Sequence, residues 1–145
     1  MYKHILIPTD GSERSARAIA QGMALAAALK AKVTALMATM PIPPVVLEGL
    51  AAPVANEELE QNAKNYATRC LGVATGAAAA TGVRCEAIHI KHDRPWEAIL
   101  QVADQKGCDM IVMASHGRAG VSAVVLGSET NKVLTHSKLP VLVCR

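Results

Sequence analysis

Short apolar runs alternate along the chain with longer segments in which apolar residues recur every three or four positions. The short runs cover residues 3–9, 33–38, 84–91, 109–114 and 139–144, and their composition predicts five β-strands. The longer segments predict helices, because this spacing places the apolar side chains on one helix face. Five strands alternating with four helices indicate an α/β protein whose parallel sheet is covered on both faces.

The second helix is predicted to be the longest and to bury one apolar stripe. The prolines in residues 41–55 lack the amide donor that helices and sheets require, so this segment is expected to be a loop. The stripe is expected to contain Leu59, Ala63, Tyr66, Cys70, Val73 and Ala77. The helix boundaries are expected at Ser12 for the first helix, Asn56 and Gly82 for the second, Pro95 and Gly107 for the third, and Ser128 and Ser137 for the fourth.

Right-handed crossovers restrict the order in which five such strands can pair. They fit one doubly wound sheet of order 3-2-1-4-5, forming a single domain over residues 1–145. Ligands of such sheets bind at the carboxyl ends of the strands, beside the switch point between strands one and four. The loops after Thr9 and Ala114 lie there, so these loops are the expected place for function.

The loop after Ala114 carries the strongest candidate chemistry. Gly117, Gly120 and Gly127 allow the backbone to approach a ligand, and a helix that begins at Ser128 presents amides suited to phosphate oxygens. These features indicate an anion, such as the phosphates of a nucleotide. The same glycines also suit tight turns, and Ser128 also suits a helix cap, so a purely structural explanation stays open on these residues alone.

Three stretches of the chain resemble the universal stress protein family, and together they span nearly its whole length. They are ILIPTDGS at residues 5–12, SHGRAGVSAVVLGSETNKVL at 115–134 and SKLPVLVCR at 137–145. The middle stretch is similar to the signature of nucleotide-binding members, which is Gly, two residues, Gly, nine residues, then Gly-Ser or Gly-Thr. Gly117, Gly127 and Ser128 match this spacing, whereas Ala114 replaces the first glycine.

The resemblance implies a binding site for ATP, with or without Mg²⁺. It assigns the adenosine side to Pro8, Thr9, Asp10 and Ala38, the floor to Met113 and Ala114, and the phosphates to Gly117, Arg118, Gly127, Ser128, Glu129 and Thr130. Two of these residues also have structural explanations. Asp10 begins a common Asp-Gly turn, and Arg118 suits a solvated loop.

Composition narrows the remaining function classes. Hydrophobic residues make up 51% and charged residues 19% of the chain, which argues against intrinsic disorder. With no Phe, one Trp and two Tyr, the chain has few aromatic side chains on which bases or a flavin could stack. The net charge of +3 is not gathered into a basic run, so we expect no nucleic-acid partner.

Apolar segments and cysteines give further expectations. The longest stretch without charged residues, 33–47, has 15 residues and three prolines, so we expect no membrane span and a cytoplasmic protein. The four cysteines lack the spacing of a zinc site and are expected to be reduced thiols. They are Cys70, Cys85, Cys108 and Cys144.

The sequence contains no recognisable catalytic group. No lysine follows Gly127 as a P-loop requires, and Ser128 has no neighbouring base, so slow or absent hydrolysis is expected. His116 is expected to be a polar turn residue. His89 and His92 fall on opposite faces of a strand, which argues against a metal site with Asp93.

Three interpretations remain. The first is an ATP-binding stress-response protein that signals through occupancy. The second is a homodimeric stress-induced interaction module that binds no nucleotide, with Ala114 marking the loss of the site. A slow ATPase is a third possibility. Dimerisation is expected through the apolar edge strand formed by Val141, Leu142, Val143 and Cys144.

Overall fold

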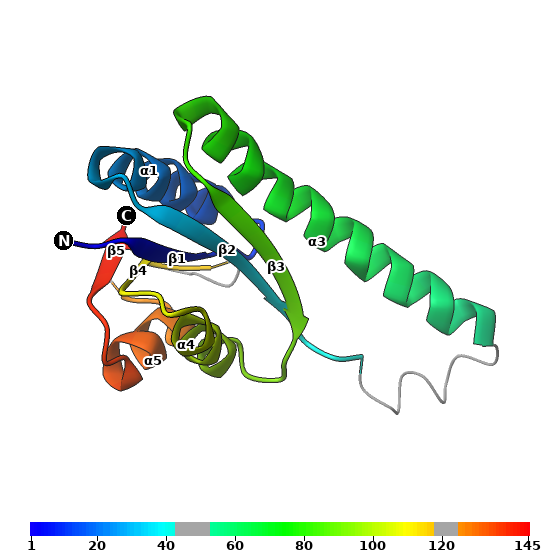
Figure 1. The fold of residues 1–145 in the computed structure, drawn as a ribbon. Coiled ribbons are helices and arrows are strands. Elements are labelled where there is room, and N and C mark those ends of the chain that lie inside the picture. The colour runs from blue at the N-terminus through cyan, green and yellow to red at the C-terminus, as the bar shows by residue number, and fades with distance from the viewer. Residues whose placement is uncertain (43–52, 118–124) are drawn as a thin grey trace.

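One five-stranded parallel sheet forms the centre of the protein (Figure 1). The computed structural model describes residues 1–42, 53–117 and 125–145. The strands pair in the order β3-β2-β1-β4-β5, which confirms the predicted order. Their bounds are His4–Pro8 for β1, Lys32–Thr39 for β2, Cys85–Lys91 for β3, Met110–Ala114 for β4 and Val141–Cys144 for β5.

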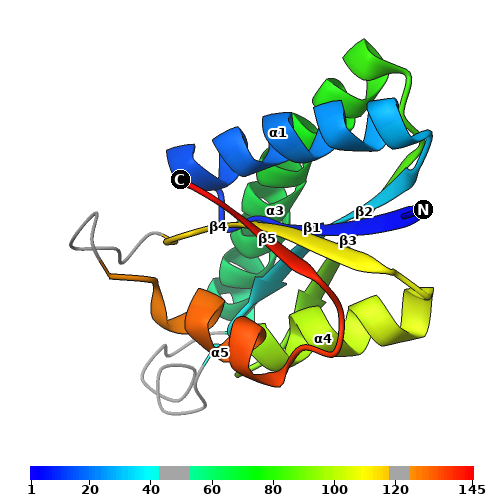
Figure 2. The same ribbon diagram turned by 90° about the vertical axis from the view of Figure 1, so that its left-hand side faces the viewer.

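In the described part of the chain four helices cover the two faces of the sheet, as the alternation of elements predicts. Figure 2 shows α1 on one side of the sheet and α4 and α5 on the other. Residues of α1 and α3 share one hydrophobic core with the sheet, and residues of α4 and α5 share a second. The helices are α1 (Glu13–Leu29), α3 (Pro53–Thr81), α4 (Pro95–Lys106) and α5 (Ser128–His136).

The central strand β1 is buried on both faces, which explains why its sequence is continuously apolar. Ile5 and Ile7 belong to the core beneath α1 and α3, whereas Leu6 belongs to the core beneath α4 and α5. All three side chains have no exposed surface. Successive side chains of a strand point to opposite faces, so a short apolar run supplies both cores at once.

The long helix α3 begins earlier than expected. It starts at Pro53, so Asn56 lies inside the helix and is not its N-cap. Proline suits the first turn of a helix, because the amide that it lacks has no partner there in any case. Residues 53–55 of the predicted loop over residues 41–55 are therefore helical. Residues 43–52 lie outside the described part of the chain.

The predicted apolar stripe of α3 is only partly correct. Cys70 is buried, but Leu59 and Val73 are exposed. Figure 1 shows the first part of α3 extending past the end of β3, where the helix has no sheet beside it. Val73 is one position away from the face that packs on the sheet. The buried residues of that face are Ala67, Cys70, Leu71, Ala74 and Ala78, with Ala63, Tyr66 and Ala77 partly buried.

All four cysteines are free thiols, as expected. Cys70, Cys108 and Cys144 are buried, and Cys85 is partly buried. Burial raises the pKa of Cys108 to about 11 and also raises the pKa of Cys144 and of Cys85. A buried thiol with a raised pKa stays protonated near neutral pH and reacts slowly, so these residues act as small packing groups.

None of the described helices combines the length and apolarity needed to cross a membrane.

Gly22 of α1 packs closely against side chains of the sheet. A Cβ built at this residue would lie 2.5 Å from Cδ1 of Ile7 and 3.3 Å from Cγ1 of Val112, both of which are buried in the core. Gly76 in α3 is a useful comparison, since a Cβ there would meet no atom within 4 Å.

We predict that Gly22→Ala and Gly76→Ala change stability in opposite directions. Gly76→Ala should stabilise the protein by about 0.5–1 kcal/mol, because alanine favours a helix over glycine. Gly22→Ala gains the same helix preference but overpacks the core at a cost of about 1–3 kcal/mol, for a net loss of about 1 kcal/mol. Urea unfolding of both variants measures the difference. Equal stabilisation by both would contradict close packing of α1 on the sheet.

Candidate functional site

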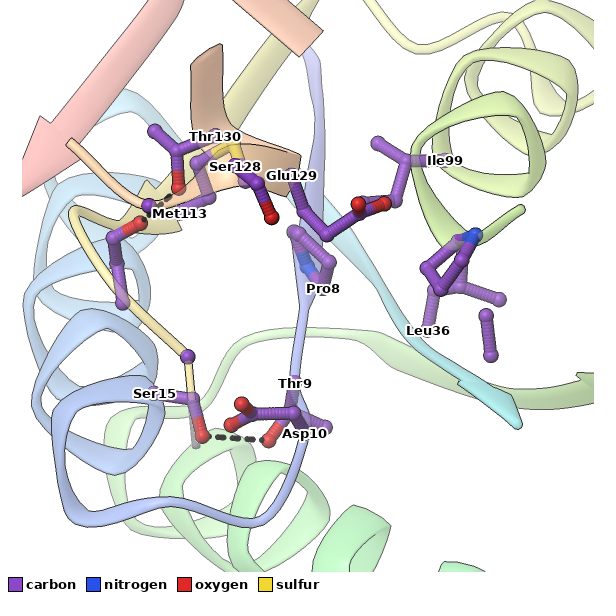
Figure 3. A pocket seen from close by; sticks show the side chains of 15 residues that line it. Pro8, Thr9, Asp10, Ser15, Leu36, Ile99, Met113, Ser128, Glu129 and Thr130 are labelled. Carbon is purple, nitrogen blue, oxygen red and sulfur yellow. Dashed lines mark hydrogen bonds between the residues drawn. The ribbon is translucent and has the colours of Figure 1, made fainter. Parts of the chain in front are cut away.

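A cavity of about 320 Å³ opens at the carboxyl ends of the strands (Figure 3). Its wall contains the ends of β1, β2 and β4 and the first turns of α4 and α5. It lies where β1 and β4 pair while their following helices, α1 and α5, cover opposite faces of the sheet. This is the switch point at which a doubly wound sheet leaves room for a ligand.

The predicted site residues come together in this cavity, with one exception that the structure does not address. Arg118 lies outside the described residues. The predicted residues that line the cavity are Pro8, Thr9, Asp10, Ala38, Met113, Ala114, Gly117, Gly127, Ser128, Glu129 and Thr130.

Four further residues of the wall escaped the sequence analysis. Leu36 lies two positions before Ala38 on β2, so strand alternation could have identified it. Ser15 lies in the first turn of α1. Pro95 and Ile99 come from the first turns of α4, and only the packing of α4 across the sheet brings them to the cavity.

The loop after β1 is held by its own polar side chains. The amide of Ser12 donates to Oδ1 of Asp10 (3.0 Å), and the amide of Ser15 donates to Oγ of Ser12 (3.1 Å). Thr9 Oγ1 and Ser15 Oγ are hydrogen-bonded at 3.0 Å (Figure 3). Gly11 adopts a φ of +80°, which favours glycine. The Asp-Gly turn and the Ser12 cap therefore explain the local structure, and Asp10 still contributes to the cavity wall.

The start of α5 is fixed directly to the end of β4. The amide of Gly127 donates to the carbonyl of Ser115 (2.8 Å), and Oγ1 of Thr130 donates to the carbonyl of Ala114 (2.9 Å). A Cβ on Gly127 would lie 3.2 Å from both the Ser115 oxygen and Cα of His116. Because these neighbours are backbone atoms, a side chain at this position would push the start of α5 away from β4 by a few tenths of an ångström.

Gly127, and not Ser128, is the N-cap of α5, and within the described part of the chain no side-chain hydrogen bond caps this end of the helix. The structural explanation of Ser128 as a cap is therefore wrong: Ser128 is the first helical residue. The first backbone amides of a helix lack partners within the helix, and the helix dipole makes this end positive. Ser128, Glu129 and Thr130 all line the cavity, so this positive end borders the space available to a ligand.

The side chain of Ala114 belongs to the core on the other side of the sheet. Ala114 packs with Val112 and α1 in the core beneath α1 and α3, whereas Met113 packs in the core beneath α4 and α5. Ala114 is 8% exposed, and its carbonyl accepts the hydrogen bond of Thr130. Alternation along β4 thus directs its methyl group away from α5.

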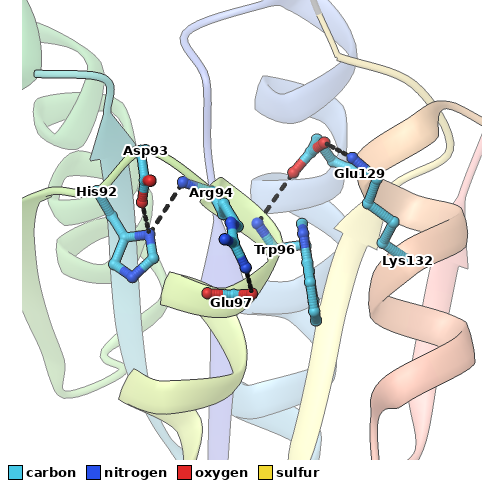
Figure 4. Close-up of polar contacts among 7 residues, drawn as sticks. All are labelled: His92, Asp93, Arg94, Trp96, Glu97, Glu129 and Lys132. Carbon is cyan, nitrogen blue, oxygen red and sulfur yellow. Dashed lines mark hydrogen bonds and ion pairs between the residues drawn. The ribbon is translucent and has the colours of Figure 1, made fainter.

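Charged side chains are unevenly distributed around the cavity. Its described wall contains two carboxylates, Asp10 and Glu129, and neither a lysine nor an arginine. Oε2 of Glu129 accepts a hydrogen bond from the amide of Trp96 (2.9 Å), and Oε1 pairs with Nζ of Lys132 (3.1 Å) (Figure 4). An anionic ligand would therefore meet helix amides and two negative side chains.

The histidines considered in the sequence have ordinary polar neighbours. His116 is buried, with Nδ1 3.2 Å from Oγ of Ser115. Nε2 of His89 is 2.8 Å from Oγ1 of Thr39, and Nδ1 of His92 accepts from the amide of Arg94. Among residues 1–42, 53–117 and 125–145 no group of three or more His, Cys, Asp or Glu side chains is arranged to hold a metal ion.

Thr130 gives a direct test of the contact between α5 and β4. Thr130→Val keeps the shape of the side chain but removes the donor to the buried carbonyl of Ala114, so we expect a loss of about 1–2 kcal/mol in the free energy of unfolding. Thr135→Val is the matched control, because Thr135 is exposed and bonds within the same helix. Urea unfolding of the two variants compares them, and equal losses would contradict a specific role for Thr130.

Comparisons with known proteins agree with this architecture. The chain matches the family model described as "Universal stress protein family" over residues 1–145. It is 36% identical over its whole length to the full length of a universal stress protein of Thermus aquaticus.

Solved structures give the same result. The structure of MJ0577 of Methanocaldococcus jannaschii is similar with a TM-score of 0.78 and 30% identity, over 99% of this chain and 96% of that one. A universal stress protein in complex with cAMP is similar with a TM-score of 0.73 and 28% identity, over 99% of this chain and 97% of that one. With the sequence match, the sheet order and the switch-point cavity in agreement, this chain belongs to the universal stress protein family.

Proposed function

We propose that this chain binds ATP in the switch-point cavity and signals through its occupancy without using hydrolysis. The single observation that carries the proposal is the positive start of α5, whose N-cap is a glycine, in the wall of a cavity that is otherwise mainly apolar. Helix N-termini of this kind bind phosphate groups through their amides. The proposal includes a cytoplasmic location and a role in the response to stress.

The two ends of the cavity suit the two parts of a nucleotide. Leu36, Ala38 and Pro8 offer an apolar surface for an adenine ring, and Thr9 and Asp10 supply oxygens for the ribose hydroxyls. Gly127 and Ser128 lie at the start of α5, and Gly117 lies between this helix end and the carboxylate of Asp10. The relative solved with cAMP supports an adenine nucleotide as the ligand class.

The replacement of the first motif glycine by Ala114 does not argue against this ligand. Its methyl group packs in the core beneath α1 and α3, whereas the proposed phosphate position borders α5 on the other face. The backbone of Ala114 retains its own function, since its carbonyl holds Thr130. The proposed site therefore tolerates alanine at this position.

The residues around the cavity favour signalling through bound ATP over hydrolysis of ATP. Ser128 has no base beside it in the sequence, and the described wall offers no lysine to withdraw charge from a leaving phosphate. Mg²⁺ would fit the proposed complex, because a cation can bridge the phosphates and the carboxylates of Asp10 or Glu129.

Isothermal titration with ATP and Mg²⁺ tests the proposal. We expect saturable binding by the wild-type protein and at least tenfold weaker binding by Gly127→Ala, because the added Cβ displaces the start of α5 from Ser115 and His116. Gly76→Ala is the control, since it makes the same change on the exposed face of α3. A folded wild-type protein that gives no heat up to millimolar ATP would refute the proposal and favour the nucleotide-free interaction module.

We further propose that the chain forms a twofold dimer through β5. This strand is an edge of the sheet, and Leu142 at its centre is 40% exposed. An exposed apolar edge strand has unpaired backbone groups that invite pairing with another strand. A second copy of the same edge would cover both the backbone and the apolar side chain.

Sedimentation velocity at micromolar concentration tests the dimer. We expect a wild-type dimer and at least tenfold weaker association for Leu142→Lys, because the ammonium group would have to be buried. Leu134→Lys is a matched control, because Leu134 has nearly the same exposure, 39%, but lies on α5. A wild-type monomer, or an equal effect of the two substitutions, would contradict the β5 interface.

A further inference from the structure

We propose that Glu129 determines how much negative charge the cavity accepts from a nucleotide. Its carboxylate occupies the N-terminus of α4 and places a fixed negative charge beside the phosphate end of the cavity. Free ATP is therefore disfavoured relative to adenosine, and Mg²⁺ restores its binding. This inference rests on the proposed binding of adenine nucleotides.

Two helix N-termini meet at the cavity, and both attract anions. The first turns of α4 contribute Pro95 and Ile99 to the wall, and the first turn of α5 contributes Ser128. The N-cap of α4 is Arg94, whose side chain makes no capping hydrogen bond. From the chemistry of the backbone alone, either helix could receive a phosphate group.

Glu129 makes the two helix ends different. Its Oε2 accepts the hydrogen bond of the Trp96 amide at 2.9 Å, so a carboxylate of α5 serves as the anion for α4 (Figure 4). A ligand phosphate that approached α4 would have to displace this carboxylate. The N-cap of α5 is Gly127, which has no side chain, and among the described residues no side chain is seen to occupy this helix end, so we assign it to the ligand.

The carboxylate of Glu129 is held in place on both of its oxygens. Oε1 pairs with Nζ of Lys132, while Trp96 stacks on His136 with ring centroids 4.7 Å apart. The stacked rings join α4 to the end of α5, so α4 cannot easily move away from Glu129. The Lys132 side chain is 50% exposed, and an exposed ion pair screens the negative charge only in part.

This arrangement predicts charge selection among adenine nucleotides. Figure 3 shows Glu129 in the wall of the cavity, next to the labelled Ser128 at the start of α5. Each phosphate added to adenosine increases the repulsion by the Glu129 carboxylate. A divalent cation between phosphate and carboxylate reverses the sign of the interaction.

The substitution Glu129→Gln tests the inference, because glutamine keeps an oxygen acceptor for the Trp96 amide and removes only the charge. Titrations with adenosine and with ATP, each with and without Mg²⁺, measure how strongly the site discriminates. We expect the ratio of ATP affinity to adenosine affinity without Mg²⁺ to rise at least tenfold in the variant. The enhancement of ATP binding by Mg²⁺ should shrink correspondingly.

Glu97→Gln is the matched control. Glu97 lies in the same first turn of α4 and pairs with Arg94, but it does not line the cavity. Its substitution should leave the ratio within about twofold of wild type. The fluorescence of Trp96, the only tryptophan of the chain, reports whether the contact between α4 and α5 survives in each variant.

The possible outcomes separate the inference from the proposed function. If the wild-type protein binds adenosine and ATP but Glu129→Gln leaves their ratio unchanged, the role of Glu129 is refuted and the proposed function stands. If the wild-type protein binds neither, both are refuted. Should Glu129→Gln alter the Trp96 emission, Glu129→Ala gives a second test of the charge, and an unchanged ratio there also refutes the inference.

Discussion

The contact between the end of β4 and the start of α5 is the constraint on which the cavity depends. Two hydrogen bonds make it, from the Gly127 amide to the Ser115 carbonyl and from Thr130 Oγ1 to the Ala114 carbonyl. The sheet order places β4 beside β1 with their helices on opposite faces, and this opens a space at the carboxyl ends. Because α5 is fixed at the edge of that space, the positive N-terminus of the helix forms one wall of the cavity.

Much of this architecture follows from the sequence for physical reasons. A strand buried on both faces must be apolar throughout, and a helix between parallel strands must carry an apolar stripe, so β1 and α1 leave clear patterns. The order of the strands then follows from the right-handed crossover. The strands predicted to end at Thr9 and Ala114 meet at the switch point of the sheet, so the sequence alone predicts where the cavity lies.

Features that depend on packing between distant segments could not be predicted in this way. Nothing local distinguishes Leu59 from a buried leucine, yet its side chain is exposed, and the length by which α3 extends past the sheet is not visible in the sequence. Pro95 and Ile99 reach the cavity only because α4 packs beside α5. The hydrogen bond between Glu129 and the amide of Trp96 joins residues 33 positions apart, and no periodicity in the sequence indicates it.

The packing of the Ala114 side chain changes the interpretation of this residue. In the sequence it is a departure from the nucleotide-binding signature, and a methyl group at a glycine position suggests a blocked site. In the structure the methyl group packs into the core that faces α1, and we propose that the charge of Glu129 is the main opposition to a phosphate ligand. Electrostatics, more than steric exclusion, is therefore proposed to decide which nucleotides bind.

A crystal structure of the protein grown with ATP and Mg²⁺ tests the central claim most directly. The account predicts electron density for the triphosphate at the start of α5, within hydrogen-bonding distance of the backbone amides of Ser128 and Glu129, with the adenine ring near Ala38. An empty cavity, or a nucleotide whose phosphates lie away from α5, would contradict it.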